Sequence, residues 1–298
     1  MTDTKPTYII GAHRFEAEPL APGLYVVATP IGNLGDMTIR ALATLAAAET
    51  VLCEDTRTSG KLMERFSLKT RLAPYHEHNA QKVRPQILER LQQGATIALI
   101  SDAGMPLVSD PGYRLVKEAV EMSIPVTACP GPSAVLTGLA LSGLPTDRFL
   151  FAGFVPQKQG ERKKLFAEFA KLRATLIFFE SPHRIIETLH DLVTALPGRQ
   201  VAVTRELTKL HEEVLRGEAA DIAMQLEARP SVKGEITLLV GPPEADEEVS
   251  ETELENAIAH ALAEMPASKA ASEVAKRFNL NRSDVYQRIL ARRESDGA

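Results

Sequence analysis

A chain of 298 residues is longer than one compact core usually holds, so two domains, or two domains with an appendage, are expected. Its formal net charge of -5 excludes a uniformly basic nucleic-acid coat, so any contact with a polyanion must come from local patches. Two cysteines, Cys53 and Cys129, and the lack of an apolar run long enough to cross a bilayer predict a cytoplasmic protein with reduced thiols and no membrane contact.

The first part of the chain alternates short β-type runs with helical patterns, which is typical of a mostly parallel α/β domain. Residues 1–22 are expected to be a flexible N-terminus, and residues 23–146 the first domain. The expected strands and helices, in chain order, are strand 24–29, helix 36–48, strand 50–54, helix 57–66, strand 71–75, helix 80–93, strand 96–101, helix 110–122, strand 125–129 and helix 132–142.

After a turn-rich link at 142–147 the pattern changes, and residues 147–243 are expected to form a second α/β domain, with a cleft between the two domains. Several strands here follow one another closely, which indicates a mixed sheet. The expected elements are strand 148–155, helix 159–171, strand 175–180, helix 182–195, strands 200–206 and 213–217, helix 218–228 and strand 235–240.

The end of the chain is different in character. Residues 244–252 carry many acids and predict a solvated linker, and residues 253–298 predict a small helical, basic module. From Ser268 we expect a helix, a turn at 279–281 and a second helix capped by Ser283, similar to a helix-turn-helix pair. Seven basic and two acidic residues between Ser268 and Arg293 suit a phosphate backbone. A helical cap or a dimer contact is the alternative.

Three of the expected strands end in loops rich in Gly, Pro and Asp: residues 30–36, 101–112 and 130–134. In an open parallel sheet, ligands bind beyond the carboxyl ends of the strands, because backbone amides and helix N-termini converge there. In the second loop the Asp102 carboxylate stands beside Ala103 and Gly104, which are small enough to let a ligand approach the backbone. A small-molecule site is therefore expected where the three loops meet.

Several kinds of site are disfavoured by spacing. A dinucleotide-binding loop needs three glycines, and the first loop offers only Gly32 and Gly35. The chain has no G-x-x-x-x-G-K-[ST] sequence for a triphosphate. His76 and His78 have no further ligands at metal-binding spacing, so no metal is expected.

Eight motifs follow one another along the chain: V-A-T-P-I-G-N-L-G-D, E-D-T-R, S-D-A-G-M-P-L-V-S-D-P-G, P-G-P-S-A, G-L-P-T-D-R-F, E-S-P-H-R, R-E-L-T-K and K-G-E. This series resembles the tetrapyrrole methylase superfamily over about residues 23–242. Within it, the chain is similar to bacterial enzymes that methylate the ribose 2′-oxygen of a decoding-region cytidine in 16S ribosomal RNA, many of which carry a similar basic tail. Met105 departs from the pattern, because the family often has Thr there.

The resemblance implies a homodimer that acts on 16S rRNA within the small ribosomal subunit, with S-adenosylmethionine held in the cleft between the two domains. Phe179 would be an adenine wall, with a plain core role as the alternative. The implied cofactor contacts in the loops are Pro30, Ser101, Asp102, Ala103, Gly104, Val108, Ser133 and Ala134.

Methyl transfer to a ribose oxygen depends mainly on alignment and on exclusion of water, so a base is helpful but not required. Glu54, Asp55 and His76 are the candidate bases, and Arg57 could hold a phosphate beside the target nucleotide. An Asp55–Arg57 surface pair or helix cap is the alternative. Arg205, Glu206 and Lys209 are more typical of an ion-pair network.

RNA contacts are expected from basic residues in the second domain and the tail, namely Lys158, Arg162, Lys163, Lys164, Arg184, Lys276, Arg277 and Arg282. Two other functions stay open from the residues alone. One is methylation of a tetrapyrrole or another small acceptor. The other is a ribosome- or DNA-associated binding protein with a non-catalytic cleft.

Overall fold

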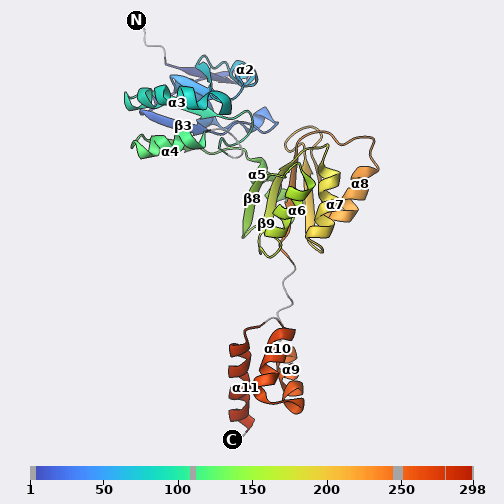
Figure 1. Cartoon of the computed structure of the whole chain (residues 1–298). Helices are drawn as coiled ribbons and strands as arrows, with labels where there is room; N and C mark the ends of the chain where they lie inside the picture. Colours follow the sequence, from blue (N-terminus) through green and yellow to red (C-terminus); the bar gives the residue numbers. More distant parts are fainter. Residues whose placement is uncertain (1–4, 108–111, 244–250, 279, 297–298) are drawn as a thin grey trace. The chain divides into compact units, whose positions relative to one another are not determined.

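The computed structural model describes residues 5–107, 112–243, 251–278 and 280–296 (Figure 1). The chain divides into two compact units, residues 1–243 and residues 244–298. The predicted linker at 244–252 falls largely outside the described residues, and its last two residues belong to a helix.

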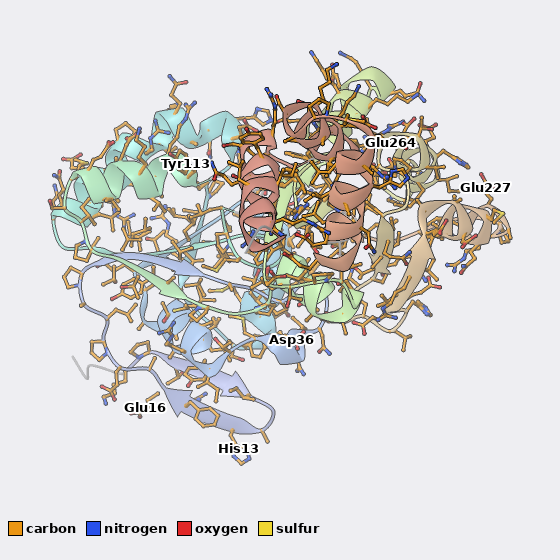
Figure 2. The ribbon with its side chains drawn as sticks, turned by 90° about the horizontal axis from the view of Figure 1, so that it is seen from below. His13, Glu16, Asp36, Tyr113, Glu227 and Glu264 are labelled. Carbon is orange, nitrogen blue, oxygen red and sulfur yellow. The ribbon has the colours of Figure 1, made fainter. Side chains whose placement is uncertain are left out.

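The first unit begins with a β-hairpin, β1 (Thr7–Ile10) and β2 (His13–Glu16). The ring of Tyr8 stacks on Phe15 at 5.5 Å and is buried in the core, while the Ile9 N–H donates to the Phe66 carbonyl at 2.9 Å. Figure 2 shows His13 and Glu16 on the outer strand of this hairpin. The expectation of a flexible arm was therefore wrong for residues 7–16, because Tyr8 anchors them to the core.

The first sheet has five strands, all paired in parallel, in the order β5-β4-β6-β3-β7. Both faces are covered, which explains why its central strands are continuous apolar runs. The hairpin, α1 and α2 pack in one core, and α3 and α4 pack in the other. Cys53 and Cys129 are buried and free, as expected. The elements are β3 (Gly23–Val27), α1 (Ile39–Ala47), β4 (Thr50–Cys53), α2 (Thr56–Arg65), β5 (Arg71–Pro74), α3 (Glu77–Gln92), β6 (Thr96–Ile100), α4 (Tyr113–Glu121) and β7 (Val126–Cys129), with a 3-10 turn at Leu34–Asp36.

Helix α5 (Ala134–Ser142) follows β7, and the Oγ of its N-cap Ser133 accepts from the Leu136 N–H. Its apolar face does not cover the first sheet. Val135 and Leu139 pack instead against Ile177 and Leu239 of the second sheet. A helix that the sequence assigned to the first domain, ending at residue 146, thus belongs to the core of the second sheet.

The second sheet is mixed, as predicted, in the order β11-β10-β12-β9-β8. Only β8 and β9 pair in parallel, and the other pairs are antiparallel. Helices α6, α7 and α8 pack in a separate core from that of α5, and Figure 1 shows them on the opposite face of the sheet. The elements are β8 (Phe149–Phe154), α6 (Gln159–Glu168), β9 (Thr175–Glu180), α7 (Ile185–Ala195), β10 (Gln200–Arg205), β11 (Glu213–Glu218), α8 (Ala219–Glu227) and β12 (Ile236–Val240).

The second unit is a three-helix module of α9 (Glu251–Glu264), α10 (Ala267–Arg277) and α11 (Arg282–Asp296) around an apolar core. Helix α9 precedes the two helices expected from Ser268 onward and lies almost entirely within residues 253–298, which were expected to be helical. The Ser283 N–H donates to Asn281 Oδ1 at 2.9 Å, so Asn281 caps α11 in place of Ser283. Among the described residues, no helix is long and apolar enough to cross a membrane.

A buried ion pair joins α6 to α7. Arg162 is 1% exposed, and its guanidinium lies 2.6 Å from a carboxylate oxygen of Asp191, which also accepts from Gln159 at 3.0 Å. Burial raises the pKa of Asp191, but the hydrogen bonds from Arg162 and Gln159 outweigh this and hold the pKa below its usual value. Arg162 therefore stabilises the second half of the unit.

We expect Arg162→Met to lower the free energy of unfolding by about 3–5 kcal/mol, because it leaves the Asp191 charge buried without its main partner. Urea unfolding measures this. Lys164→Met, an exposed position on the same helix, should change the stability by less than about 0.5 kcal/mol. Equal stabilities of the two variants would contradict the assignment.

Candidate functional site

The three glycine-rich loops follow three neighbouring strands, since β3 lies between β6 and β7 in the sheet. A two-way backbone bridge joins the first two loops: the Thr29 N–H donates to the Gly104 carbonyl at 2.9 Å, and the Gly104 N–H donates to the Thr29 carbonyl at 3.0 Å. Gly104 has φ +82°, and a Cβ there would lie 3.2 Å from the Ile31 side chain and 3.6 Å from the Pro132 carbonyl oxygen of the third loop. The expected meeting of the loops is confirmed.

Two residues expected to contact the cofactor are not part of the pocket lining. Ser101 is buried, and its hydroxyl donates to the Gly104 carbonyl at 3.0 Å, so it holds the shape of the second loop. Pro30 follows the bridge residue Thr29 and also lies outside the lining. Val108 lies outside the described residues.

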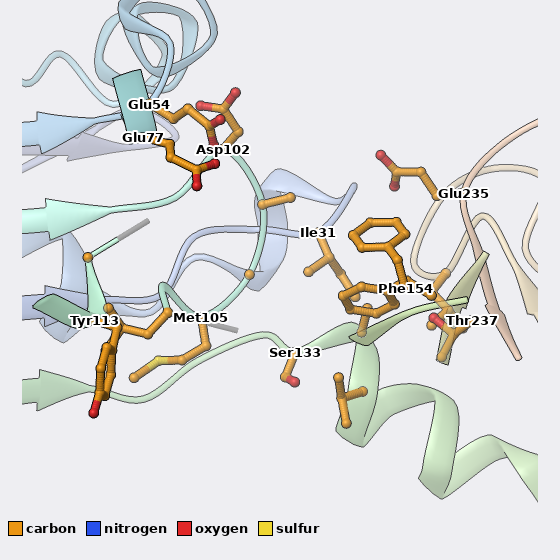
Figure 3. A pocket seen from close by; sticks show the side chains of 18 of the residues that line it. Ile31, Glu54, Glu77, Asp102, Met105, Tyr113, Ser133, Phe154, Glu235 and Thr237 are labelled. Carbon is orange, nitrogen blue, oxygen red and sulfur yellow. The ribbon is translucent and has the colours of Figure 1, made fainter. Parts of the chain in front are cut away.

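A cavity of about 1000 Å³ opens at this edge of the first sheet and is lined from both halves of the unit (Figure 3). The predicted residues that line it are Asp102, Ala103, Gly104, Ser133, Ala134, Phe179 and Glu54. Glu235 of the K-G-E motif also lines it. Residues that the sequence reasoning did not select are Ile31, Tyr75, Glu77, Arg84, Tyr113, Arg114, Phe154, Leu207 and Thr237. Tyr75, Phe154 and Leu207 stand at the end of a strand or just after it, which is the signal that could have found them.

One side of the cavity is acidic. Glu54, Glu77 and Asp102 follow β4, β5 and β6, and Figure 3 shows them close together. Asp102 Oδ1 accepts from the Asp55 N–H at 3.3 Å, which ties the second loop to the start of α2. No group of three acidic, His or Cys side chains in the described part of the chain is arranged to hold a metal ion. This side suits a ligand with a positive charge and with amine or hydroxyl donors.

The other side is aromatic. Phe179 meets Phe151 edge-on at 4.9 Å and Phe154 at 5.4 Å between ring centroids. Phe154 is 61% exposed, an unusual exposure for a phenylalanine, and it lines the cavity together with Phe179. Phe179 therefore packs against the second sheet's core and also lines the cavity, while its contact with adenine stays a prediction. The pair forms an apolar surface on which a planar group can lie.

Asp55 and Arg57 lie outside the cavity lining. Asp55 caps α2 by accepting from the Arg57 N–H at 2.8 Å, and it pairs with the Arg57 guanidinium at 2.8 Å. The hydrogen bond from Arg57 lowers the pKa of Asp55 to about 2, which makes this carboxylate a weak base near neutral pH. The structure therefore shows the alternative, a surface pair and helix cap.

His76 also lies outside the cavity lining, although its neighbours Tyr75 and Glu77 belong to it. The His76 N–H donates to Asn79 Oδ1 at 2.9 Å at the start of α3. Its Nδ1 is buried without a hydrogen-bond partner among the described residues. Of the four predicted catalytic residues, only Glu54 faces the cavity.

The basic cluster expected to bind RNA on α6 is largely paired. Arg162 is buried against Asp191, so the prediction that it contacts RNA was wrong. Arg184, which precedes α7, is partly exposed and lies 2.6 Å from the buried Glu180 carboxylate; its contact with RNA stays a prediction. Lys158 pairs with Glu161 at 3.1 Å and Lys163 with Asp191 at 3.6 Å. Lys164 is exposed.

An ion-pair network lies where β10 ends and β12 begins, and it includes the three residues for which a network was predicted. Lys209 Nζ lies 2.8 Å from Glu206 and 2.9 Å from the cavity-lining Glu235. Arg205 pairs with Glu213 at 3.0 Å. A Cβ on Gly32 would collide with the Lys209 side chain, so the first loop packs directly on this network. Lys209 thereby positions Glu235 beside the cavity.

In the three-helix module the predicted RNA contacts Lys276, Arg277 and Arg282 are exposed. Arg282 donates to the Ser268 hydroxyl at 3.0 Å. Arg288 pairs with Glu251, and Arg292 pairs with Glu255 at 2.9 Å. Part of the positive charge counted in the sequence is thus neutralised by the acids of α9.

We expect Gly104→Ala to lower the free energy of unfolding by about 1–2 kcal/mol, because an L side chain is strained at φ +82° and would press on Ile31. Gly160→Ala is the matched control, since a Cβ there meets no atom within 4 Å. Urea unfolding of both variants is the measurement. A Gly104→Ala protein as stable as the control would show that the loop bridge tolerates a side chain.

Comparison with solved structures agrees with the fold. Uroporphyrin-III-C-methyltransferase from Thermus thermophilus matches with a TM-score of 0.51 at 22% identity, over 74% of this chain and 94% of that chain. A diphthine synthase matches with a TM-score of 0.57 at 14% identity, over 73% of this chain and 89% of that chain. At these identities the likeness shows the architecture alone.

Sequence comparison is more specific. The chain is 49% identical over 290 residues to "Ribosomal RNA small subunit methyltransferase I" of Mesorhizobium japonicum, covering 97% of this chain and 98% of the relative. It is 48% identical over 278 residues to the protein of the same name from Erythrobacter litoralis, covering 93% and 98%. The family model "Tetrapyrrole (Corrin/Porphyrin) Methylases" matches residues 23–223, and the model "RsmI C-terminal HTH domain" matches residues 248–293. The chain therefore belongs to the tetrapyrrole methylase family and carries the C-terminal helix-turn-helix domain of its RsmI members.

Proposed function

We propose that this protein transfers a methyl group from S-adenosylmethionine to the ribose 2′-oxygen of a decoding-region cytidine in 16S ribosomal RNA. The observation that carries the proposal is the cavity with an acidic side at the loop edge of the first sheet and an aromatic side at the edge of the second. The names of the relatives support ribosomal RNA of the small subunit as the substrate. The homodimer that the family resemblance implies stays a prediction.

The cavity residues fit S-adenosylmethionine. The methionine end carries an ammonium group and a sulfonium, which suit the carboxylates of Asp102 and Glu54 and the exposed backbone beside Gly104. The adenine suits the apolar surface of Phe154 and Phe179. The hydroxyl of Ser133 lies between these sides in Figure 3, and that of Thr237 lines the cavity beside Phe154; both are partners for the polar groups of the ribose.

When bound, S-adenosylmethionine supplies a methyl group already activated by the positive sulfur. The chain's own contribution is then to hold the acceptor oxygen in line and to exclude water, which for well-aligned groups is worth up to about 7–11 kcal/mol. Glu54 is the cavity carboxylate proposed to accept the hydroxyl proton, a role typically worth roughly 10²–10⁴-fold in rate. The bridge between Thr29 and Gly104 and the ion pairs of Lys209 hold the acidic and aromatic sides of the cavity at a fixed spacing.

The substrate assignment is tested by incubating the protein with radiolabelled S-adenosylmethionine and either small ribosomal subunits or naked 16S rRNA. We expect label in the RNA, and we expect none when the target nucleotide is 2′-deoxy, because the accepting oxygen is missing. Label that survives the 2′-deoxy substitution would reject ribose methylation. Label in a small tetrapyrrole acceptor but not in RNA would support the alternative enzyme, and binding of RNA without any transfer would support a non-catalytic protein.

The cofactor assignment is tested by Asp102→Ala. Loss of a charge-assisted hydrogen bond should weaken binding of S-adenosylmethionine by roughly 10- to 100-fold. Isothermal titration calorimetry measures the affinity, and thermal unfolding checks that the fold is intact, since Asp102 is exposed. Glu168→Ala, an exposed acid on α6 away from the cavity lining, is the matched control. Undiminished affinity in the Asp102 variant would overturn the assignment.

A further inference from the structure

The segment from Thr56 to Arg71, which contains α2 and the turn into β5, carries five basic residues and one acid, Glu64. The five basic residues are exposed, and we call them the α2 ridge: Arg57, Lys61, Arg65, Lys69 and Arg71. The first three are spaced four residues apart, so they lie along one face of the helix at steps of about 6 Å. The segment is a local concentration of positive charge in a chain of net charge -5.

The ridge differs from the α6 cluster in the availability of its charges. Residues 158–173 carry six basic and two acidic residues, which is the same net charge. There, Arg162 is buried in an ion pair, and Lys158 and Lys163 are paired on the surface. On the α2 ridge only Arg57 has an acidic partner, Asp55. Lys61, Arg65, Lys69 and Arg71 make no side-chain hydrogen bond or ion pair with any residue that the structure describes.

The ridge begins beside the cavity. Glu54 lines the cavity, and the next residue, Asp55, caps α2 and donates its N–H to Asp102. From there the ten residues of α2 extend about 15 Å toward the opposite ends of the strands, where Lys69 precedes β5 and Arg71 begins it. The positive charges therefore run outward from beside the cavity residue Glu54, along α2 and into the start of β5; the position of α2 on the first sheet is labelled in Figure 1.

The cavity lining also includes Arg84 and Arg114, but its acidic side limits how a nucleic acid can enter. Glu54, Glu77 and Asp102 repel phosphate groups, so a ribose inside must keep its flanking phosphates outside the acidic side. The exposed cations of the α2 ridge begin next to that side and can bind these outer phosphates, because a phosphodiester backbone gains affinity from every cation it contacts.

We propose that the α2 ridge binds the phosphodiester backbone of the RNA strand whose ribose enters the cavity. This inference rests on the proposed function and adds to it the surface that orients the substrate. Backbone contacts of this kind position the strand and carry no sequence information. Selection of one nucleotide would then come from elsewhere in the complex.

The test compares two charge-reversal variants of the full-length protein. Lys61→Glu with Arg65→Glu alters the ridge, and both substitutions are exposed and compatible with a helix. Arg148→Glu with Lys171→Glu is the control with the same change in net charge. Those residues are exposed and precede β8 and β9, at the opposite ends of the strands from the cavity residues Phe154 and Phe179.

Three measurements are made on each variant: methylation kinetics with 16S rRNA, direct binding of the same RNA across a salt series, and calorimetry with S-adenosylmethionine. For the ridge variant we expect the KM for RNA to rise by about 10-fold or more, and the salt slope of log affinity to fall by about 1.4, since two phosphate contacts are lost. Cofactor affinity should stay within about 2-fold of the unaltered protein, because neither residue lines the cavity. The control variant should retain its RNA affinity and salt slope.

If the unaltered protein methylates RNA and the ridge variant has an unchanged KM and salt slope, the proposal that the ridge binds RNA is overturned and the proposed function stands. Equal losses in both double variants would overturn the proposal for the ridge too, because they would indicate general repulsion by added negative charge. If the unaltered protein binds RNA but transfers no methyl group, the proposed function fails, and the binding series alone decides the ridge by the same comparison. Failure of the unaltered protein to bind RNA would reject both.

Discussion

The pair of backbone hydrogen bonds between Thr29 and Gly104 is the constraint on which the site depends. It joins the loops after β3 and β6 beyond the point where the two strands stop pairing with each other. Because Gly104 also stands against Ile31 and Pro132, the third loop is held in the same place. The Ser101 hydroxyl donates to the Gly104 carbonyl and so maintains this arrangement. The groups that face a ligand are those that the bridge leaves exposed, above all Asp102. Rigid placement of such groups is what gives a binding site its precision.

The cavity is completed by elements that come much later in the chain. Helix α5 crosses from the first sheet to the core of the second, which brings Ser133 and Ala134 to the boundary between the halves. The ends of β8 and β9 then supply the aromatic side, and the start of β12 supplies Glu235 and Thr237. Lys209, packed on Gly32 and paired with Glu235, links the first loop to this second set. The acidic and aromatic sides are therefore spaced by packing between the halves.

Charge is distributed unevenly over the first unit. Basic residues of α6 and α7 mostly neutralise buried or neighbouring carboxylates, and so stabilise the second sheet's helices. Basic residues of α2 have few such partners and remain available to an external polyanion. An acidic cavity beside an exposed basic helix separates the place where a cationic ligand is held from the place where a phosphate backbone can be held.

The sequence by itself determined the strands of the two five-stranded sheets, the three loops, the mixed second sheet, the buried cysteines and the position of Asp102 and Ser133 at the loop edge, because apolar periodicity and Gly or Pro punctuation are local signals. Only the tertiary structure decided that Tyr8 anchors a hairpin, that α5 serves the second sheet, and that Arg162 and Arg184 pair with buried carboxylates. It also brought Glu77, Phe154 and Glu235 into one cavity. The reason is physical: Asp191 lies 29 residues from Arg162, and no local pattern records which distant carboxylate will neutralise a given cation.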